Sequence, residues 1–343
     1  MPITMQDVAR KANVSKTAVS AVVGRFGKVT RVRVGEATRQ RIIAAANELG
    51  YSTNILASGL RKGKTQTIGV ILEHLSGETN TLRARAVEDL AREHGYRVFF
   101  CCHNSRGELE EADVRDLVAR RVDGLIVSPV FRAADEGSPH LQGLAEKRFP
   151  LVTFYDRLPF PVNSVTVDNV YGGLLVVRHL IEIGRKKLAF IGGNPVYQAI
   201  RDRFTGWREG CREAGLDFEA MPFLKFISGS SEEAVGYQLC RTLIRDGRKF
   251  DALVTSNDHL ALGSLKALQD AGVRIPEDAA VAGYDDNRFA EFLSIPLTTV
   301  RQPAKEVGEA AFQILLRKME APESPLETIV LKPSLVVRQS TMI

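Results

Sequence analysis

The chain has 343 residues, of which 44% are apolar and 25% are charged. This length predicts two domains or a little more, and the ordinary glycine and proline content excludes a collagen-like or wholly disordered chain. No apolar run approaches the roughly 18 residues of a membrane-spanning helix, and the N-terminus lacks a basic stretch followed by an apolar one, so we expect a soluble cytoplasmic protein.

The net charge of +5 is divided unevenly along the chain. Residues 1–64 hold 12 Lys and Arg against three acidic residues, whereas the remainder holds 34 against 38. Such a concentration indicates nucleic acid or another anionic surface as the partner of the N-terminal unit. A solvated basic tail would carry the same charge, so charge alone does not distinguish such a tail from a folded DNA-binding unit. The residue pattern distinguishes them.

The first predicted element is a short helix that follows Thr4 and ends near Ala12. Asp7 stands where its carboxylate can reach back to the start of this helix. Asn13 comes next, and this residue type tolerates the left-handed backbone of a tight turn. The apolar face of the helix consists of Val8, Ala9 and Ala12.

A second short helix begins after Ser15, whose hydroxyl can cap it, and its inward face carries Val19, Val22 and Val23. Two short helices joined by a few residues form a helix-turn-helix candidate. Lys16 can reach either a guanine edge or a phosphate, and ordinary surface is the alternative to a DNA-reading face. That face, opposite the valines, resembles a recognition helix in the major groove and holds Ser15, Lys16, Thr17, Ser20 and Ala21.

A third helix is predicted from about Glu36 to Leu49, with Gly50 as its stop. Its spacing predicts that Ile42, Ile43, Ala46 and Leu49 face the core. Because the first 64 residues hold few aromatic side chains, stacking on single-stranded bases is poorly supported. The unit therefore favours duplex DNA.

Four motifs of the N-terminal unit are specific: Met5-Gln6-Asp7-Val8-Ala9, Ala12-Asn13-Val14-Ser15-Lys16-Thr17-Ala18-Val19-Ser20, Thr38-Arg39 and Glu48-Leu49-Gly50-Tyr51. With them the chain resembles the LacI/GalR family of bacterial transcription regulators, and the resemblance covers nearly the whole chain. It implies a DNA-binding headpiece over residues 1–52, with Thr4 among its DNA contacts, and a hinge helix and linker over 53–64.

Asn54, Ala57 and Leu60 match the family's hinge segment, which becomes helical on operator DNA. The resemblance implies that Leu60 is the wedge that enters the central minor groove and kinks the duplex. An ordinary linker leucine is the alternative. Thr53 stands where the family usually has proline, and Gly59 lies inside the hinge, so this helix is expected to form less readily than is typical.

Residues 24–34 form a stretch that is longer than in the family's best-known members. It adds Lys28, Arg31 and Arg33, which we expect to contact DNA phosphates and to raise the salt dependence of binding. A mobile basic loop without a defined contact is the alternative.

From Gln66 onward, apolar runs alternate with helical patterns, which predicts an α/β fold of parallel sheets. The predicted strands span 68–72, 98–102, 124–128, 151–155, 188–191, 224–227, 252–255 and 280–282. The resemblance implies an effector-binding and dimerisation core over 65–343, with two lobes like those of periplasmic binding proteins. We place the N-lobe at about 65–167 plus 302–331 and the C-lobe at about 168–301 plus 332–343.

Ligands of open α/β sheets bind beyond the carboxyl ends of the strands, where polar side chains stand in this chain. The resemblance implies that the effector contacts are Asp156, Asp168, Arg203, Asn257 and Asp285. Acids and amides accept hydroxyl protons and arginine donates in a rigid fork, which suits a polyhydroxylated or anionic ligand. We expect Asp258 to cap the following helix instead, and a turn residue is the alternative for Asp285.

The chain departs from the family's sugar-binding pattern in its aromatic residues. Gly77-Glu78-Thr79-Asn80 stands where many members have Asn-Pro-Phe-Phe, and Ser231 stands near the usual place of another aromatic. A pyranose would lose its apolar platform here. Either the ligand is not a simple sugar, or Phe131, Tyr197 or another residue substitutes, or no effector binds.

Two other protein classes share parts of this pattern. A periplasmic binding protein has the two lobes but would need an export signal and no basic headpiece. For an α/β enzyme, Ile191-Gly192-Gly193 follows a predicted strand, yet no complete nucleotide-binding or nucleophile-elbow motif occurs there. The six histidines and four cysteines lack metal-ligand spacing, so we expect no enzyme activity, no metal and no cofactor.

The predicted function is a homodimeric, sequence-specific transcription regulator, a repressor rather than an activator. Its expected partners are a pseudo-palindromic operator, a second copy of the chain and a small polar effector such as a sugar derivative, with no membrane. Effector binding between the lobes is expected to change operator affinity. We expect the protein to act on the bacterial nucleoid.

Overall fold

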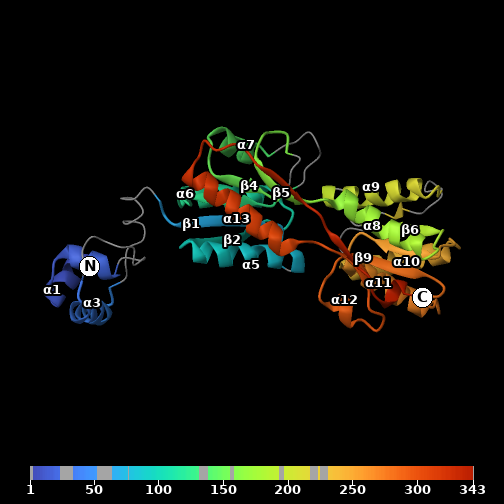
Figure 1. The fold of residues 1–343 in the computed structure, drawn as a ribbon, viewed down its shortest axis with the longest axis horizontal. Coiled ribbons are helices and arrows are strands. Elements are labelled where there is room, and N and C mark those ends of the chain that lie inside the picture. Colours follow the sequence, from blue (N-terminus) through green and yellow to red (C-terminus); the bar gives the residue numbers. More distant parts are fainter. Residues whose placement is uncertain are drawn as a thin grey trace.

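The computed structural model describes residues 3–23, 34–51, 64–75, 77–130, 138–154, 158–192, 197–216, 223–224 and 231–342 (Figure 1). Within these ranges no helix is both long enough and apolar enough to cross a membrane. The predictions for Lys28, Arg31, Arg33, Asn54, Ala57, Leu60, Phe131 and Asp156 lie outside the described residues. The predicted domain boundaries near residues 52 and 64 stay predictions.

The N-terminal unit contains α1 (Met5–Ala12), α2 (Lys16–Val23) and α3 (Glu36–Glu48). Its buried core is made of Val8, Ala9, Ala12, Val19, Ile42, Ala45 and Ala46. The prediction that Ile43 faces inward is wrong, because its side chain is 36% exposed. Ile42, Ala45 and Ala46 lie on one face at helical spacing, and the residue after Ile42 is turned by about 100° away from it.

The described residues from 64 onward form two six-stranded sheets and the helices around them, with strand orders β11-β5-β4-β3-β1-β2 and β12-β10-β9-β8-β6-β7. We call the first sheet and its helices the N-lobe and the second sheet and its helices the C-lobe. Every neighbouring pair is parallel except β10 and β12. The expectation of parallel sheets therefore holds apart from one antiparallel edge strand.

The strands of the N-lobe are β1 (Thr67–Leu72), β2 (Arg97–Cys102), β3 (Gly124–Val127), β4 (Leu151–Thr153), β5 (Asn163–Val167) and β11 (Thr328–Leu331). Its helices are α5 (Glu78–Glu93), α6 (Gly107–Ala119), α7 (Pro139–Glu146) and α13 (Ala304–Glu320). Alternate residues of β1 face opposite helix layers: Ile68, Val70 and Leu72 pack with α5 and α13, and Ile71 packs with α6 and α7. Figure 1 shows α13, from the end of the chain, beside α5 from its first third.

The strands of the C-lobe are β6 (Leu188–Ile191), β7 (Phe223–Leu224), β8 (Ala252–Thr255), β9 (Ala280–Asp285), β10 (Thr298–Arg301) and β12 (Ser334–Val336). Its helices are α8 (Asn169–Glu182), α9 (Gln198–Glu213), α10 (Glu232–Arg245), α11 (Asp258–Asp270), α12 (Phe289–Phe292) and the 3-10 helix η1 (Gln339–Thr341). One core joins the sheet to α8 and α9, and another joins its opposite face to α10 and α11. All four cysteines of the chain are free thiols.

The chain passes between the two sheets after β5, after β10 and after β11. These crossovers place the carboxyl ends of β1, β3 and β4 opposite those of β8 and β9. Residues that follow the strands in both lobes therefore meet in one region, as the sequence predicts for this class of fold.

Candidate DNA-binding face and effector cleft

The face of α2 opposite the small N-terminal core is open to solvent. Ser15, Lys16, Thr17 and Ser20 are exposed and Ala21 is half-buried, whereas Val19 on the other face is fully buried. The Ser15 hydroxyl oxygen accepts a hydrogen bond from the backbone N–H of Ala18 at 3.2 Å, which caps the helix. The predicted reading residues therefore stand together at the start of a capped helix.

Thr4 is exposed at the start of α1 and makes the predicted helix cap with Asp7. Its backbone N–H and its hydroxyl donate to the same Asp7 carboxylate oxygen at 2.9 Å and 2.7 Å. The hydrogen bond from the Thr4 side chain lowers the pKa of Asp7, so this cap is ionised at neutral pH. The cap fixes where α1 begins and leaves Thr4 at the surface.

A cleft of about 650 Å³ lies between the two lobes. Its N-lobe wall is formed by residues after β1, β3 and β4 and by the start of α5, and its C-lobe wall by residues of α9 and those after β8 and β9. This volume suits a small ligand. Three of the predicted effector residues, Arg203, Asn257 and Asp285, line the cleft.

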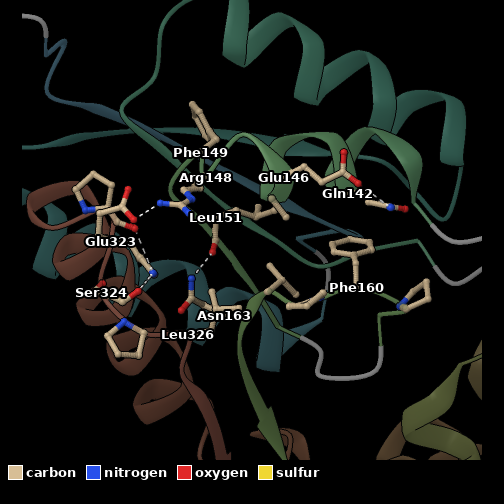
Figure 2. Close-up of a pocket in the computed structure, with 17 residues that line it drawn as sticks. Gln142, Glu146, Arg148, Phe149, Leu151, Phe160, Asn163, Glu323, Ser324 and Leu326 are labelled. Atoms are coloured by element: carbon tan, nitrogen blue, oxygen red, sulfur yellow. Dashed lines mark hydrogen bonds and ion pairs between the residues drawn. The ribbon is translucent and has the colours of Figure 1, made fainter.

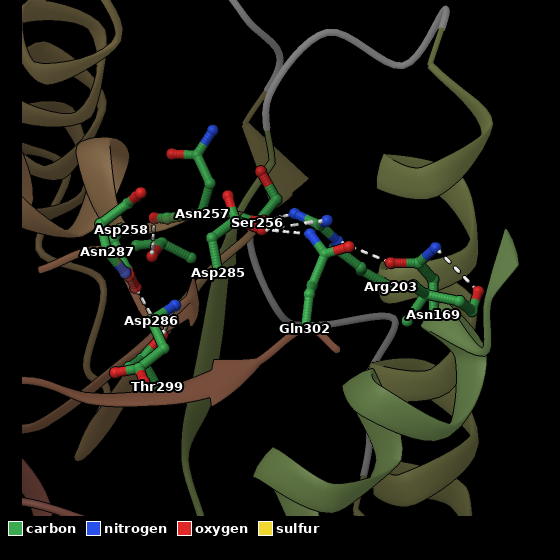
Figure 3. Close-up of polar contacts among 12 residues, drawn as sticks. Asn169, Arg203, Ser256, Asn257, Asp258, Asp285, Asp286, Asn287, Thr299 and Gln302 are labelled. Atoms are coloured by element: carbon green, nitrogen blue, oxygen red, sulfur yellow. Dashed lines mark hydrogen bonds and ion pairs between the residues drawn. The ribbon is translucent and has the colours of Figure 1, made fainter. Parts of the chain in front are cut away.

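Arg203 is the most heavily bonded of these residues (Figure 3). Its guanidinium donates from Nε to Asn169 Oδ1 at 3.0 Å and from Nη1 to the Ser256 carbonyl at 2.6 Å, and Nη2 lies 3.2 Å from Asp285 Oδ1. The guanidinium also stacks over the Tyr284 ring, 3.7 Å from its centroid. With 7% of the residue exposed, Arg203 is locked in place.

Asp285 ends β9 with a backbone φ of 109°, a conformation that non-glycine residues rarely adopt. Its Oδ1 also accepts a hydrogen bond from Gln302 Nε2 at 2.6 Å. Gln302 Oε1 in turn accepts one from Arg83 Nη2 at 3.0 Å. One polar chain thus runs from Arg203 in the C-lobe through Asp285 and Gln302 to Arg83 in the N-lobe, and such strained backbone is typical of ligand-binding positions.

Asn257 both lines the cleft and caps a helix. Its Oδ1 accepts from the Leu260 backbone N–H at 2.9 Å, and its Nδ2 donates to Glu232 Oε1 at 3.0 Å. Burial raises the pKa of Glu232, with the hydrogen bond from Asn257 opposing it. Asn257 therefore orders this carboxylate at the wall of the cleft.

The prediction that Asp258 caps α11 is wrong, because Asn257 is the cap. Asp258 is fully buried at the first helical position. Its Oδ1 accepts from the Thr299 hydroxyl at 2.6 Å and its Oδ2 from the Asn287 backbone N–H at 2.7 Å. The residue therefore ties α11 to β10 and to the loop after β9.

We expect Asp258→Asn to flatten the pH dependence of C-lobe stability. Burial raises the pKa of Asp258 well above its ordinary value, so the folded state holds the proton more tightly than the unfolded chain. Its contribution to stability is present below the unfolded pKa and is lost as pH rises through the folded pKa. Urea titrations that start at about pH 4, near the pKa of an unfolded aspartate, and continue to about pH 8 should show a smaller fall in the variant. An equal fall in the free energy of unfolding of both proteins would contradict a raised pKa of Asp258 in the folded state.

Asp168 is not among the residues that line the cleft. Its Oδ1 accepts from the Tyr171 backbone N–H at 2.9 Å and caps α8, while the next residue, Asn169, reaches the cleft. Ser231 likewise caps α10 by accepting from the Ala234 N–H at 3.3 Å. The side chains of Asp168 and Ser231 both cap helices because each residue stands at the N-cap, a position where oxygen-bearing side chains are favoured.

Tyr197 joins the two lobes across the cleft. Its hydroxyl donates to Glu73 Oε1 at 2.7 Å and lies 2.8 Å from the Ser105 hydroxyl. The Arg288 backbone N–H donates to Glu78 Oε2 at 2.6 Å, which adds a second interlobe contact. Burial raises the pKa of Tyr197 to about 12, so its hydroxyl keeps its proton at neutral pH. Tyr197 thus adds an aromatic ring to the cleft wall and helps to hold the lobes together.

A second cavity of about 650 Å³ lies at the opposite end of the N-lobe, near the start of β4 and β5 (Figure 2). Its wall is rich in proline and phenylalanine, and Lys318 is turned to the carbonyls of Pro322 and Ser324. Arg148 and Glu323 form an ion pair at its rim. No cluster of metal-ligating side chains occurs in the described part of the chain.

Comparison with known proteins finds matches to both the N-terminal unit and the two-lobed core. Residues 4–54 match the bacterial regulatory proteins of the lacI family, and residues 177–341 match the periplasmic binding protein-like domain. The chain is 30% identical over 344 residues to the HTH-type transcriptional regulator DegA of Bacillus subtilis, covering 99% of this chain and 98% of that protein. The chain belongs to the LacI family.

Two further similar proteins cover almost all of the chain. The ribose operon repressor of Escherichia coli is 32% identical, covering 98% of this chain and 99% of the repressor. A crystal structure of the lac repressor dimer bound to operator and the anti-inducer ONPF superimposes with a TM-score of 0.85 at 26% identity and covers all of both chains. The headpiece and the two-lobed core are thus the LacI-family arrangement, as the resemblance implies.

Several cleft residues escaped the sequence analysis. Glu73 directly follows β1. A search for polar side chains at the carboxyl ends of the strands could therefore have found it. Arg83 and Gln302 carried no such signal, because one lies within a helix and the other in a crossover between the lobes. Only the packing of the two lobes brings them to the cleft.

Proposed function

We propose that this LacI-family chain is a homodimeric repressor that binds a pseudo-palindromic operator and responds to a small polar effector in the interlobe cleft. The observation that carries the proposal is the combination, in one chain, of an exposed helix-turn-helix face and a polar cleft between two sheets. Closure of the lobes around the effector changes their relative angle and so operator affinity, with a coupling free energy of about 1–3 kcal/mol.

The proposed DNA contacts of the described headpiece are Thr4, Ser15, Lys16, Thr17, Ser20 and Ala21. Lys28, Arg31, Arg33, Asn54, Ala57 and Leu60 complete the proposal outside the described residues, with Leu60 as the minor-groove wedge. The high positive charge of residues 1–64 supports a partner with a dense phosphate backbone.

The proposed effector contacts are Arg203, Asn257 and Asp285, with Asp156 outside the described residues. Carboxylate, amide and guanidinium groups around one cleft suit a ligand with many hydroxyl groups, such as a sugar or a sugar derivative. The name of the ribose operon repressor supports the same class.

The second copy of the chain is proposed to pack against the core lobes. On the N-lobe, the edge strand β2 and helix α5 expose Phe99, Phe100 and Leu82 at 44%, 39% and 43%. Exposed apolar groups of this size are typical of protein interfaces. We propose no catalytic activity, since the relatives are regulators, and we place the protein with DNA in the cytoplasm.

Selection of bound sequences from a random duplex pool tests this function. We expect the full-length protein to enrich a palindromic site, with half-sites spaced to match a two-fold symmetric dimer. Sequence-independent binding of the whole pool would refute the operator proposal.

Lys16→Ala is expected to weaken binding to the selected operator. If Lys16 reads a base, the variant loses preference at one position of each half-site; if it holds a phosphate, affinity falls uniformly and the salt slope decreases by about 1. Fluorescence anisotropy against salt distinguishes the two results. Lys249→Ala, an exposed lysine before β8, is the control and should bind as the wild type does. Unchanged operator affinity in Lys16→Ala would remove this residue from the interface.

A further inference from the structure

Arg83 lies at the inner end of the cleft and was not among the residues expected to bind an effector. It projects from α5 of the N-lobe, and its guanidinium lies 5.6 Å from the centroid of the Phe154 ring. Nη2 donates to Gln302, but the enclosed Nε makes no hydrogen bond within the described residues. A guanidinium with an unused buried donor therefore borders the ligand space.

The charge of Arg83 is not balanced by a direct ion pair. Among the described residues no carboxylate lies within 4.0 Å of its guanidinium nitrogens, whereas Arg203 pairs with Asp285 at 3.2 Å. Burial lowers the pKa of Arg83 to about 10, with Asp285 opposing the shift and Arg203 adding to it. Arg83 is still a cation at neutral pH, and the Asp285 carboxylate that acts on it is already paired with Arg203. Within the described part of the chain, the Arg83 guanidinium therefore has no carboxylate of its own.

The other carboxylates that line the cleft are engaged elsewhere. They bond as follows: Glu73 with Tyr197 and Ser105, Glu78 with the Arg288 backbone, Asp202 with Gln198, Glu232 with Asn257 and Glu233 with His259. None of these partners is Arg83. The carboxylate oxygens of Glu73, Glu78 and Glu232 can each accept further hydrogen bonds, including from ligand hydroxyls.

We propose that the effector carries an anionic group, a carboxylate or a phosphate, and that Arg83 is the residue that selects it. The proposal rests on the cleft being the effector site. A half-buried charge with an enclosed, unused Nε donor and no ion pair is costly, and an oxyanion at the guanidinium fork supplies the missing partner with charge-assisted hydrogen bonds. A neutral sugar leaves Arg83 uncompensated, so the cleft favours the acid over the neutral sugar of the same shape.

Matched ligands test the proposal by calorimetry on the full-length protein. The probes are glucose, glucuronate and glucose 6-phosphate, and galactose, galacturonate and galactose 6-phosphate. We expect at least one anionic member to bind about tenfold or more tightly than its neutral partner, a difference near 1.4 kcal/mol. Whether the uronate or the phosphate binds best identifies the source of the charge.

Arg83→Gln keeps a donor for Gln302 and removes the charge, so it should lower the affinity for the anion to that for the neutral sugar. Thermal unfolding of the ligand-free protein gives a second readout, since loss of an unbalanced buried charge should leave the melting temperature at least as high as in the wild type. Arg85→Gln, an exposed neighbour on α5, is the control and should change neither quantity.

Three results would overturn the proposal: a neutral sugar that binds as tightly as its anionic partners, no anionic probe that binds, or an anion preference that survives Arg83→Gln. Operator selection by the wild-type protein is measured in parallel. Specific operator binding without an anion preference would refute only the role of Arg83, whereas loss of operator specificity would refute the proposed function.

Discussion

Replacing Arg203 by methionine is expected to abolish effector binding and to lower the free energy of unfolding of the C-lobe by about 3–5 kcal/mol. Arg203 is buried, and its removal takes away the cation that pairs with the Asp285 carboxylate and a donor to the Ser256 carbonyl. Trp207 is the single tryptophan of the chain and lies one helical turn after Arg203 in α9. Its ring stacks on that of Phe204. Urea unfolding followed by tryptophan fluorescence therefore reports on this lobe.

Arg178→Met is the matched control, because Arg178 also bridges α8 and α9 by pairing with Glu213 at 3.0 Å. Both of these side chains are about half exposed, so the loss should be at most about 1 kcal/mol. A cost for Arg203→Met no larger than that of the control would show that the buried pair does not support the lobe.

Gly206→Ala is expected to destabilise the C-lobe by about 3 kcal/mol or more. A Cβ at Gly206 would come within 1.8 Å of the Val170 carbonyl oxygen, and one at Gly173 within 2.2 Å of the Arg203 carbonyl oxygen. These contacts are with backbone atoms of the facing helix, so α8 and α9 would have to move apart. Such a movement also displaces Arg203 from Asn169, and effector affinity should fall with stability.

Gly143→Ala provides the control within helix α7, where no atom of the described residues outside the adjoining helix backbone lies within 4 Å of the added Cβ. There the change should raise the free energy of unfolding by about 0.5–1 kcal/mol through lower backbone entropy of the unfolded chain. The measurement is again urea unfolding of both variants. Similar small effects at Gly206 and Gly143 would contradict the close helix contact.

Much of the fold followed from local pattern. The cap of α1, the buried valine of α2 and the strands β1, β2, β6 and β8 lie within a residue of their predicted positions, because capping and burial are recorded in adjacent residues. Ile43 was placed wrongly because two adjacent apolar residues leave the helix face ambiguous. The antiparallel strand β12 carried too short a pattern to be predicted.

The cleft was predicted only in part. Arg203, Asn257 and Asp285 reach it, whereas Asp168 serves a helix end and Asp258 is buried beneath β10. Adjacent acidic and amide residues after a strand look alike in sequence. Their roles differ because the residue at the N-cap accepts a hydrogen bond from the helix backbone, as Asn257 does. The contacts of its neighbour Asp258 are set by the tertiary packing around it.

The sequence by itself determined the class of this protein: a basic headpiece with a capped helix-turn-helix, an α/β core and membership of the LacI family. Those properties depend on residues close together in the chain, where spacing alone carries the information. Only the tertiary structure placed Arg83 near Asp285 through Gln302, across 219 positions of sequence from Arg83 to Gln302. Which charges meet in the cleft depends on how the crossovers join the lobes. No local sequence pattern encodes a contact between residues so far apart in the chain.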